Sequence, residues 1–152
     1  MLVTSEIDTI NAVPIAPNLF EFSADGAHLI GSRCVNCCEV RFPVNDFCPQ
    51  CCTETTERIA LSRRGILYSF TVQHFRPPPP YRGPENFQPY GVGMIELPEG
   101  LRVTAVLEDN NPDRLSVGIE MELIVTKLFE DEMGRDVLGY KFRCVTEITT
   151  QK

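Results

Sequence analysis

The sequence predicts a mainly β chain made of a short N-terminal helix, a metal-held ribbon and a small five-stranded barrel. Two observations predict this architecture: paired cysteine motifs in the first third of the chain, and a two-residue hydrophobic period after them. At 152 residues the chain can bury one conventional core plus a small lobe held by a metal. We expect an N-terminal arm and helix over residues 1–26, a ribbon over 27–58 and a barrel over 59–152.

The first segment is predicted to be an arm followed by a helix. Residues 1–17 contain two prolines and show no firm periodicity, which indicates an extended arm. Asn18 is a residue type that caps helices, and Gly26 tolerates the positive φ that often ends them. We therefore expect a short helix over residues 19–25, packed on its own ribbon or docked on a partner. A strand over residues 27–33 should follow it.

The central motif, CVNCCEVRFPVNDFCPQC, contains two CxxC pairs separated by ten residues. Each pair can form a tight knuckle, and four thiolates make a closed, tetrahedral zinc site. A short strand over residues 40–42 and a turn at 43–46 would join the knuckles. The motif therefore predicts a rubredoxin-like ribbon with a structural, non-catalytic zinc ion. The four predicted ligands are Cys34, Cys37, Cys48 and Cys51.

A disulfide framework or a redox pair fits these cysteines less well than a metal site. Disulfides require an oxidising compartment, and the N-terminus lacks the basic start and apolar run of a signal peptide. A thioredoxin-like redox pair requires a βαβ context. Cys38 and Cys52 follow the second ligand of each knuckle, where glycine is common. Either could replace its neighbour as a ligand, but CxxC spacing in both pairs keeps the knuckles pseudo-symmetric.

After the ribbon, apolar and polar residues alternate. Ile66, Tyr68, Phe70 and Val72 lie on one face of the first predicted strand. In residues 111–118, an asparagine cap, a proline at the first helical position and a final glycine predict a short helical insertion. Five strands with this insertion after the third fit the OB-fold, although an SH3-like barrel or small sandwich would show a similar pattern. The predicted strands span residues 66–73, 90–97, 101–107, 121–129 and 140–147.

Two features of the last strands indicate ordinary structural roles. Cys144 shares a strand face with Tyr140 and Phe142, so we expect it in the core and not as a nucleophile. The acidic residues 130–132 precede a glycine, which indicates a solvated hairpin tip.

The loop between the first two predicted strands carries the candidate binding residues. Residues 77–80 are four prolines, which predict a stiff polyproline II rod that cannot join a sheet and therefore projects. In an OB-fold this loop borders the usual ligand face, where arginines and aromatic rings could hold phosphates and a flat ring. The alternative is a rigid loop that packs on a partner subunit. The candidate residues are Arg76, Tyr81, Arg82 and Phe87.

Other polar residues near this loop have weaker functional indications. His74 continues the apolar strand face, which favours a structural role over that of a general base. Arg63 and Arg64 form a second basic pair, for which ordinary surface exposure is the simpler interpretation.

The charge of the chain limits its partners. The formal net charge is -7, which argues against binding a polyanion, although zinc ribbons and OB-folds do occur in single-stranded nucleic-acid-binding modules. No apolar run approaches the ~18 residues that span a bilayer. Together with reduced thiols, these features predict a soluble, cytoplasmic protein that binds neither nucleic acid nor membrane.

The segments LFEFSADGAHLIGSRC, CVNCCEVRFPVNDFCPQCC, RRGILYSFTV and SVGIEMEL together resemble a family of zinc-ribbon plus OB-fold proteins associated with acyl-CoA metabolism. The chain departs from that pattern at Cys38 and Cys52, where glycine is expected. The resemblance implies a small non-catalytic subunit that pairs with a thiolase-fold catalytic subunit, or with another condensing, acyltransferase or hydratase enzyme acting on coenzyme A thioesters.

Thioester cleavage requires a nucleophilic cysteine, an acid or base and an oxyanion hole, and the sequence does not assemble this set. We therefore expect catalysis in the partner, with an acyl-CoA bound near the interface. Arg76 and Arg82 would contact the coenzyme A phosphates, and Tyr81 and Phe87 the adenine or acyl group. A stand-alone metal enzyme would need an open coordination position, which four cysteines do not leave.

Overall fold

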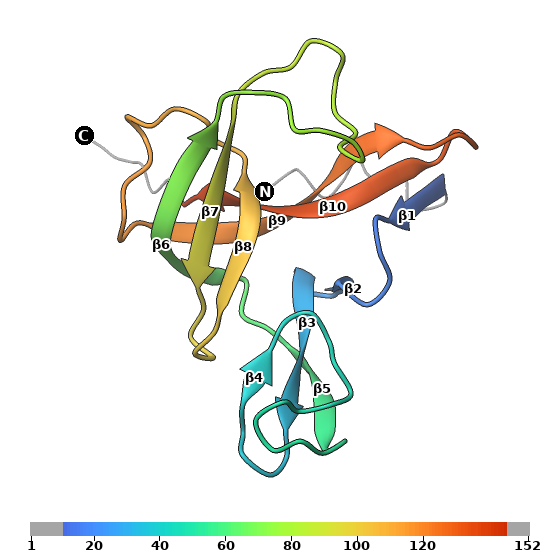
Figure 1. Cartoon of the computed structure of the whole chain (residues 1–152), viewed down its shortest axis with the longest axis vertical. Coiled ribbons are helices and arrows are strands. Elements are labelled where there is room, and N and C mark those ends of the chain that lie inside the picture. The colour runs from blue at the N-terminus through green and yellow to red at the C-terminus, as the bar shows by residue number, and fades with distance from the viewer. Residues whose placement is uncertain (1–10, 146–152) are drawn as a thin grey trace.

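A computed structural model describes residues 11–145 of the chain. Within that range it contains ten strands and no α-helix, so the predicted mainly β class is confirmed (Figure 1). In chain order the strands are β1 (Ala12–Pro14), β2 (Phe20–Ser23), β3 (Gly26–Cys34), β4 (Val40–Arg41), β5 (Thr56–Ala60), β6 (Arg64–Gln73), β7 (Tyr90–Glu96), β8 (Arg102–Leu107), β9 (Glu120–Glu130) and β10 (Asp136–Cys144).

Strands β6 to β10 form a closed five-stranded barrel. β6, β7 and β8 are consecutive antiparallel neighbours, and β9 pairs antiparallel with both β10 and β6. The barrel closes through a parallel contact between β8 and β10, where Val106 lies opposite Lys141 and Leu107 opposite Phe142. This order, with one parallel pair, is that of an OB-fold, so the predicted barrel is confirmed.

A β-bulge in β6 changes which face of that strand points inward. Its register against β7 shifts between Leu67 and Ser69. Leu67 is therefore fully buried, whereas Ile66 is 45% exposed. Beyond the bulge, the half-buried Phe70 packs against the core. The single apolar face predicted for this strand is wrong, because the inserted residue reverses the alternation.

The barrel encloses most of the hydrophobic core. Its fully buried side chains include Leu67, Ile95, Leu107, Leu123 and Phe142. Half-buried residues pack around them, and Cys144 is among these, so its predicted place in the core is confirmed.

Two predictions for the barrel region are wrong: the helical insertion and the start of the last strand. Residues 111–118 form turns and no helix. Two of their backbone N–H groups donate to other acceptors than those of a helix. The N–H of Asp113 donates to the Asn111 side chain (2.9 Å), and the N–H of Gly118 donates to the carbonyl of Leu67 (2.8 Å). The last strand starts at residue 136, not 140, because its first residues pair with the end of β9. Its predicted end lies outside the described residues.

The hairpin between β9 and β10 has the predicted acidic tip. The backbone N–H of Asp131 donates to the carbonyl of Arg135 (2.9 Å), and the Asp131 carboxylate accepts from Arg135 Nε (2.8 Å). These bonds hold the tip closed, and the Arg135 amide in particular lowers the pKa of Asp131.

The N-terminal lobe is built around β3. This strand pairs antiparallel with β2 along its first half and with β4 and β5 along its second half (Figure 1). The predicted strands over residues 27–33 and 40–42 are confirmed as β3 and β4.

Residues 19–25, predicted to be helical, form β2 and a tight turn. Phe20 lies opposite Leu29 in an antiparallel hairpin. Asn18 has a φ of 61°, whereas a helix N-cap residue is extended, so no helix begins there. Gly26 does take a positive φ, 113°, but it closes the β2–β3 hairpin.

Part of the predicted arm lies on the barrel. β1 pairs in parallel with β10, where Val13 lies opposite Val137. The backbone N–H of Ile15 continues this contact by donating to the carbonyl of Leu138 (2.8 Å). The first ten residues of the arm lie outside the described residues.

The lobes are joined by polar contacts and a shared core. Arg63 is half-buried and donates to the carbonyl of Asp25 (2.6 Å), so its predicted ordinary exposure is wrong. In the segment that connects β5 to β6, Ser62 donates its N–H and its hydroxyl to the Glu99 carboxylate (2.8 and 2.9 Å), which fixes this connection on the barrel. One hydrophobic cluster also contains Leu29 of the lobe together with the buried barrel residues.

Candidate metal centre and ligand loop

Each CxxC pair forms a tight knuckle. The N–H of Cys38 donates to the carbonyl of Cys34 (2.9 Å), and the N–H of Cys52 donates to that of Cys48 (2.7 Å). Cys38 and Cys52 have φ values of 66° and 57°, in the left-handed region. Glycine is common at these positions because it adopts this conformation without steric cost. The cysteines that stand in place of glycine at positions 38 and 52 therefore preserve the knuckle geometry.

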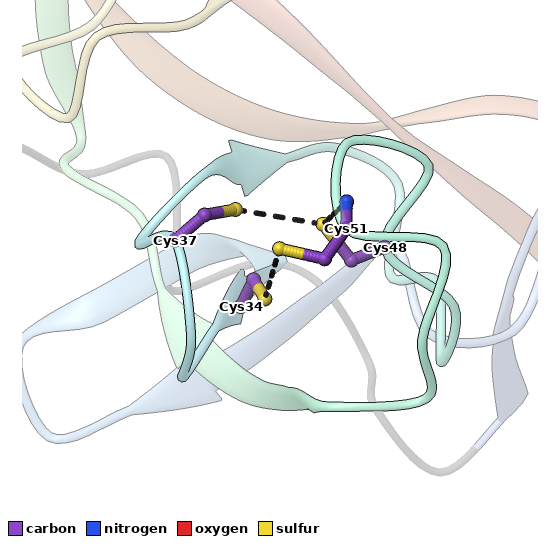
Figure 2. A group of neighbouring side chains, drawn as sticks. All are labelled: Cys34, Cys37, Cys48 and Cys51. Atoms are coloured by element: carbon purple, nitrogen blue, oxygen red, sulfur yellow. Dashed lines mark hydrogen bonds between the residues drawn. The ribbon is translucent and has the colours of Figure 1, made fainter.

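The knuckles bring four sulfur atoms together. The Sγ atoms of Cys34, Cys37, Cys48 and Cys51 all lie within 4.8 Å of one another, so this group could hold a metal ion (Figure 2). The Cys34–Cys51 and Cys37–Cys48 sulfur pairs are 3.8 and 3.6 Å apart. Tetrahedral zinc with Zn–S bonds of about 2.3 Å gives S–S distances of about 3.8 Å. A disulfide would need about 2.05 Å. The spacing therefore fits a tetrahedral metal centre.

Hydrogen-bond donors surround the sulfur atoms. The hydroxyl of Thr55 lies 3.1 Å from Cys34 Sγ, and the amide side chain of Asn36 donates to Cys51 Sγ (3.3 Å). Backbone N–H groups of Asn36 and Cys51 donate to Cys34 Sγ and Cys48 Sγ, each at 3.4 Å. Such donors stabilise the thiolates that bind a metal.

The thiols of the first knuckle differ in acidity. The Thr55 hydroxyl, helped by backbone amides, lowers the pKa of Cys34 to about 6. The Glu39 amide favours the Cys37 thiolate, but hydrogen bonding with the neighbouring thiols and partial desolvation of the sulfur among them outweigh it and raise the pKa of Cys37 to about 12, although the residue as a whole is exposed. The surroundings of the first knuckle therefore favour the thiolate at Cys34 over that at Cys37.

The predicted ligand loop connects β6 and β7 and arches beyond the barrel (Figure 1). The proline run does not form a straight rod, because the N–H of Tyr81 donates to the carbonyl of Pro78 (3.2 Å) and closes a turn. The guanidinium of Arg76 lies 5.3 Å from the Tyr81 ring centroid and donates to the carbonyl of Pro84 (2.6 Å). Arg76 thus holds its own loop in shape.

The aromatic candidates pack against each other and against Tyr90, a residue that the sequence pattern did not single out. Tyr81 stacks with Tyr90 at a centroid distance of 6.3 Å and meets Phe87 edge to face at 6.5 Å. Phe87 in turn lies 6.0 Å from Tyr90. Burial raises the pKa of Tyr90. The sequence signal that could have identified Tyr90 is its position at the start of a predicted strand, directly after the loop.

The Arg82 guanidinium lies over a ring outside this aromatic cluster. It is 5.8 Å from the ring centroid of Phe129 on β9. His74 is exposed and follows Gln73, the last residue of β6, so it does not continue the strand face predicted for it. The structure thus brings together three of the candidate loop residues, Arg76, Tyr81 and Phe87, and directs Arg82 towards β9.

A polar cleft of about 540 Å³ lies elsewhere on the barrel. Its charges are largely paired: Glu122 accepts from Arg143 (3.0 Å) and Asp109 from Arg114 (3.2 Å). Residues far apart in sequence form the cleft, so no local motif predicted it. The lining residues are Arg64, Glu108, Asp109, Arg114, Glu122, Arg143, Cys144 and Val145.

Between residues 11 and 145, the structure has no helix with the length and apolar character needed to cross a bilayer.

Comparisons with known proteins agree with this architecture. The family model of the ChsH2 C-terminal OB-fold domain matches residues 58–127. A DUF35 domain-containing scaffold protein of Methanocaldococcus jannaschii is 38% identical over 117 residues, covering 76% of this chain and 80% of that protein. Benzoylsuccinyl-CoA thiolase subunit BbsA of Thauera aromatica is 38% identical over 130 residues, covering 84% of this chain and 85% of that protein.

A solved structure extends the agreement to three dimensions. The structure titled Ltp2-ChsH2(DUF35) aldolase is similar with a TM-score of 0.60 and 27% identity, covering 77% of this chain and 84% of that chain. The cysteine cluster and the closed barrel define a protein of the zinc-ribbon plus OB-fold class. Within that class, the chain belongs to the DUF35 family.

Proposed function

We propose that this chain is a non-catalytic accessory subunit of a heteromeric thiolase that acts on a β-oxoacyl-CoA. The observation that carries the proposal is the 38% identity to a benzoylsuccinyl-CoA thiolase subunit over most of both chains. Benzoylsuccinyl-CoA is accordingly the first substrate to assay. The partner would be the thiolase-fold catalytic subunit.

The chemistry of the described residues supports an accessory role. A closed group of four cysteines leaves a metal no open coordination position, so it suits a structural zinc ion. Cys144 is half-buried, and burial raises its pKa, which disfavours the thiolate needed for nucleophilic attack. The ribbon would therefore hold shape through Cys34, Cys37, Cys48 and Cys51, while the partner performs catalysis.

The loop between β6 and β7 is the proposed contact with the coenzyme A thioester. Arg82 would bind phosphate, since its guanidinium lies over a ring and forms no ion pair among the described residues. Arg76 would add a second positive charge, and Tyr81 and Phe87 an apolar surface for the adenine or acyl group. The alternative is a loop that packs on the partner without touching the ligand.

A second candidate is an accessory role in another acyl-CoA enzyme. A probable enoyl-CoA hydratase alpha subunit of Thermomonospora curvata is 31% identical over 107 residues, covering 70% of this chain but 32% of that protein. Because this chain matches only part of that relative, the thiolase proposal has the broader support.

The test is a cleavage assay with and without the partner. The purified chain, the catalytic subunit and their mixture are each given benzoylsuccinyl-CoA and free coenzyme A. Only samples that contain the catalytic subunit should release products, and the mixture should be the most active. Cleavage by the isolated chain would overturn the accessory role.

A further inference from the structure

The four cysteines of the candidate metal centre differ in their exposure to solvent. Cys34 and Cys48 are each 1% exposed, and Cys51 is half-buried. Cys37 is exposed. Cys37 is therefore the residue of the four that solvent contacts most.

The sulfur atoms also differ in the side chains that bond to them. Cys34 Sγ lies 3.1 Å from the Thr55 hydroxyl, which is itself fixed by a bond of 2.8 Å to the hydroxyl of Thr53. Cys51 Sγ accepts from the amide side chain of Asn36 (3.3 Å). Hydrogen bonds of this kind favour the bound thiolate and lower its nucleophilicity, because they draw charge from the sulfur atom.

Cys37 has fewer such donors. The backbone amide of Glu39 faces its sulfur, and Cys48 Sγ lies 3.6 Å away. Among the side-chain hydrogen bonds of residues 11–145, none reaches Cys37 Sγ from a hydroxyl or amide group. In Figure 2 its side chain extends from the first knuckle toward Cys48. Exposure and sparse hydrogen bonding thus coincide at this one residue.

We propose that Cys37 is a modification site of the metal-loaded ribbon, where soft electrophiles such as alkyl halides react first and open the centre. The inference rests on the proposed zinc ion. A sulfur electron pair forms the new S–C bond, the C–halogen bond breaks, and the halide leaves with its electron pair. The resulting thioether is neutral, so it is a much weaker ligand than the thiolate, and the zinc–sulfur bond is lost.

Two other exposed thiols compete for the reagent. Cys38 and Cys52 lie outside the group of four sulfurs and are exposed. Both have left-handed φ values that glycine adopts readily, so a variant with Cys38→Gly and Cys52→Gly keeps the knuckles and removes the competition.

The experiment loads this double variant of the full chain with zinc and adds iodoacetamide below stoichiometry. Mass spectrometry maps the alkylated cysteines, and a colorimetric chelator follows zinc release. Alkylation at Cys37 should be at least about tenfold faster than at Cys34, Cys48 or Cys51, and zinc release should follow it, because reaction requires an accessible thiolate. Equal labelling of the four, or earlier labelling of another ligand, would overturn the proposal. The same mapping on the unsubstituted chain provides the second reading if the double variant folds poorly.

A second variant tests the hydrogen-bond asymmetry. Asn36→Leu removes the donor to Cys51 at similar size, and Gln50→Leu, next to Cys51 on the exposed surface, is the matched control. Labelling of Cys51 should rise severalfold in Asn36→Leu alone, with the Cys37 rate unchanged. An unchanged Cys51 rate would refute the protective role of Asn36. A chain that never binds zinc would overturn the proposed metal centre, whereas a zinc-loaded chain with another reactive ligand would overturn only this inference.

Discussion

The Sγ atoms of Cys34 and Cys51 lie 3.8 Å apart, although the residues are 17 positions apart and belong to different knuckles. The first knuckle follows β3 and the second precedes β5, and these strands pair with each other, Cys34 opposite Thr56. A metal ion at this point would therefore lock the end of the β3–β5 pair. Leu29 of β3 also belongs to the hydrophobic cluster that contains the barrel core, so the ribbon and the barrel pack against each other.

The ligand register can be tested by paired substitutions. Cys51→Ser should abolish stoichiometric zinc binding, because it removes a sulfur of the clustered group. Cys52→Gly should retain one zinc ion per chain, since Cys52 lies outside that group. Elemental analysis of freshly purified protein gives the metal content. Zinc retained in Cys51→Ser and lost in Cys52→Gly would place the ligand at residue 52.

The left-handed residues predict an unusual effect of glycine. Cys38→Gly should raise the free energy of unfolding by up to about 1 kcal/mol, because a non-glycine residue in this region costs roughly 1–2 kcal/mol and the greater chain entropy of glycine offsets part of the gain. Val35→Gly, at an exposed neighbouring position without a positive φ, should lower it by about 0.5–1 kcal/mol. Urea unfolding of the zinc-loaded proteins measures both. Equal destabilisation by the two changes would contradict the expected relief of strain.

Zinc binding should depend on pH with a change of slope near pH 6. Metal-bound thiolates have lost their protons, so affinity falls as pH falls. The pKa of Cys34 is lowered to about 6, so this thiol releases a proton on zinc binding only below about that pH. The pKa of Cys37 is raised to about 12, so this thiol releases a proton on zinc binding throughout the neutral range. The slope of the logarithm of apparent affinity against pH should therefore be larger below pH 6 than above it. The difference in slope should be up to about one, because Cys34 then releases up to about one additional proton when zinc binds. Chelator competition across this range measures the slopes, and equal slopes would show that Cys34 is not preferentially ionised.

The bulge in β6 predicts opposite outcomes for two adjacent residues. Leu67→Ala should destabilise the chain by about 3 kcal/mol, because it leaves a cavity at a fully buried position. Ile66→Ala, at a residue that is 45% exposed, should cost less than about 1 kcal/mol. Urea unfolding measures the difference. A larger loss of unfolding free energy for Ile66→Ala than for Leu67→Ala would contradict the bulge and support the uninterrupted alternation predicted from the sequence.

These residues also show what the sequence could predict. The cysteine spacing fixes a local structure, since two knuckles of this type have few conformations, and the structure has both of them. Alternation predicted the five barrel strands because a half-buried strand must alternate. The bulge between Leu67 and Ser69 left no local signal, so the face of β6 was predicted incorrectly. The boundaries proposed at 26/27 and 58/59 remain predictions.

The failed helix over residues 19–25 has a tertiary cause. Phe20 and Phe22 are two positions apart, as in a strand, but the segment is short enough that capping residues suggested a helix. Pairing with β3 determines the outcome, because Phe20 lies opposite Leu29 of the core. In the ligand loop, composition identified arginines and aromatics but could not show that Tyr90 completes the aromatic cluster.

The proposed role of Arg82 predicts a change in substrate affinity. Arg82→Ala should raise the KM of the complex for the coenzyme A thioester several-fold with little change in kcat, because a phosphate contact contributes uniform binding. Arg58→Ala is the control, since Arg58 is an exposed arginine of the ribbon that pairs with Glu21 (3.0 Å). Steady-state kinetics of the reconstituted complex measure both. If Arg82→Ala leaves KM unchanged, the loop serves as a packing surface and Arg82 is not a ligand contact.

The accessory role is tested most directly by purifying the tagged full chain from its native cells under non-denaturing conditions and identifying what elutes with it. We expect a thiolase-fold catalytic subunit in fixed stoichiometry, with thioester cleavage in the fractions that contain both chains. Elution of the chain as a free protein that is active by itself, or in stoichiometric complex with nucleic acid, would contradict that role.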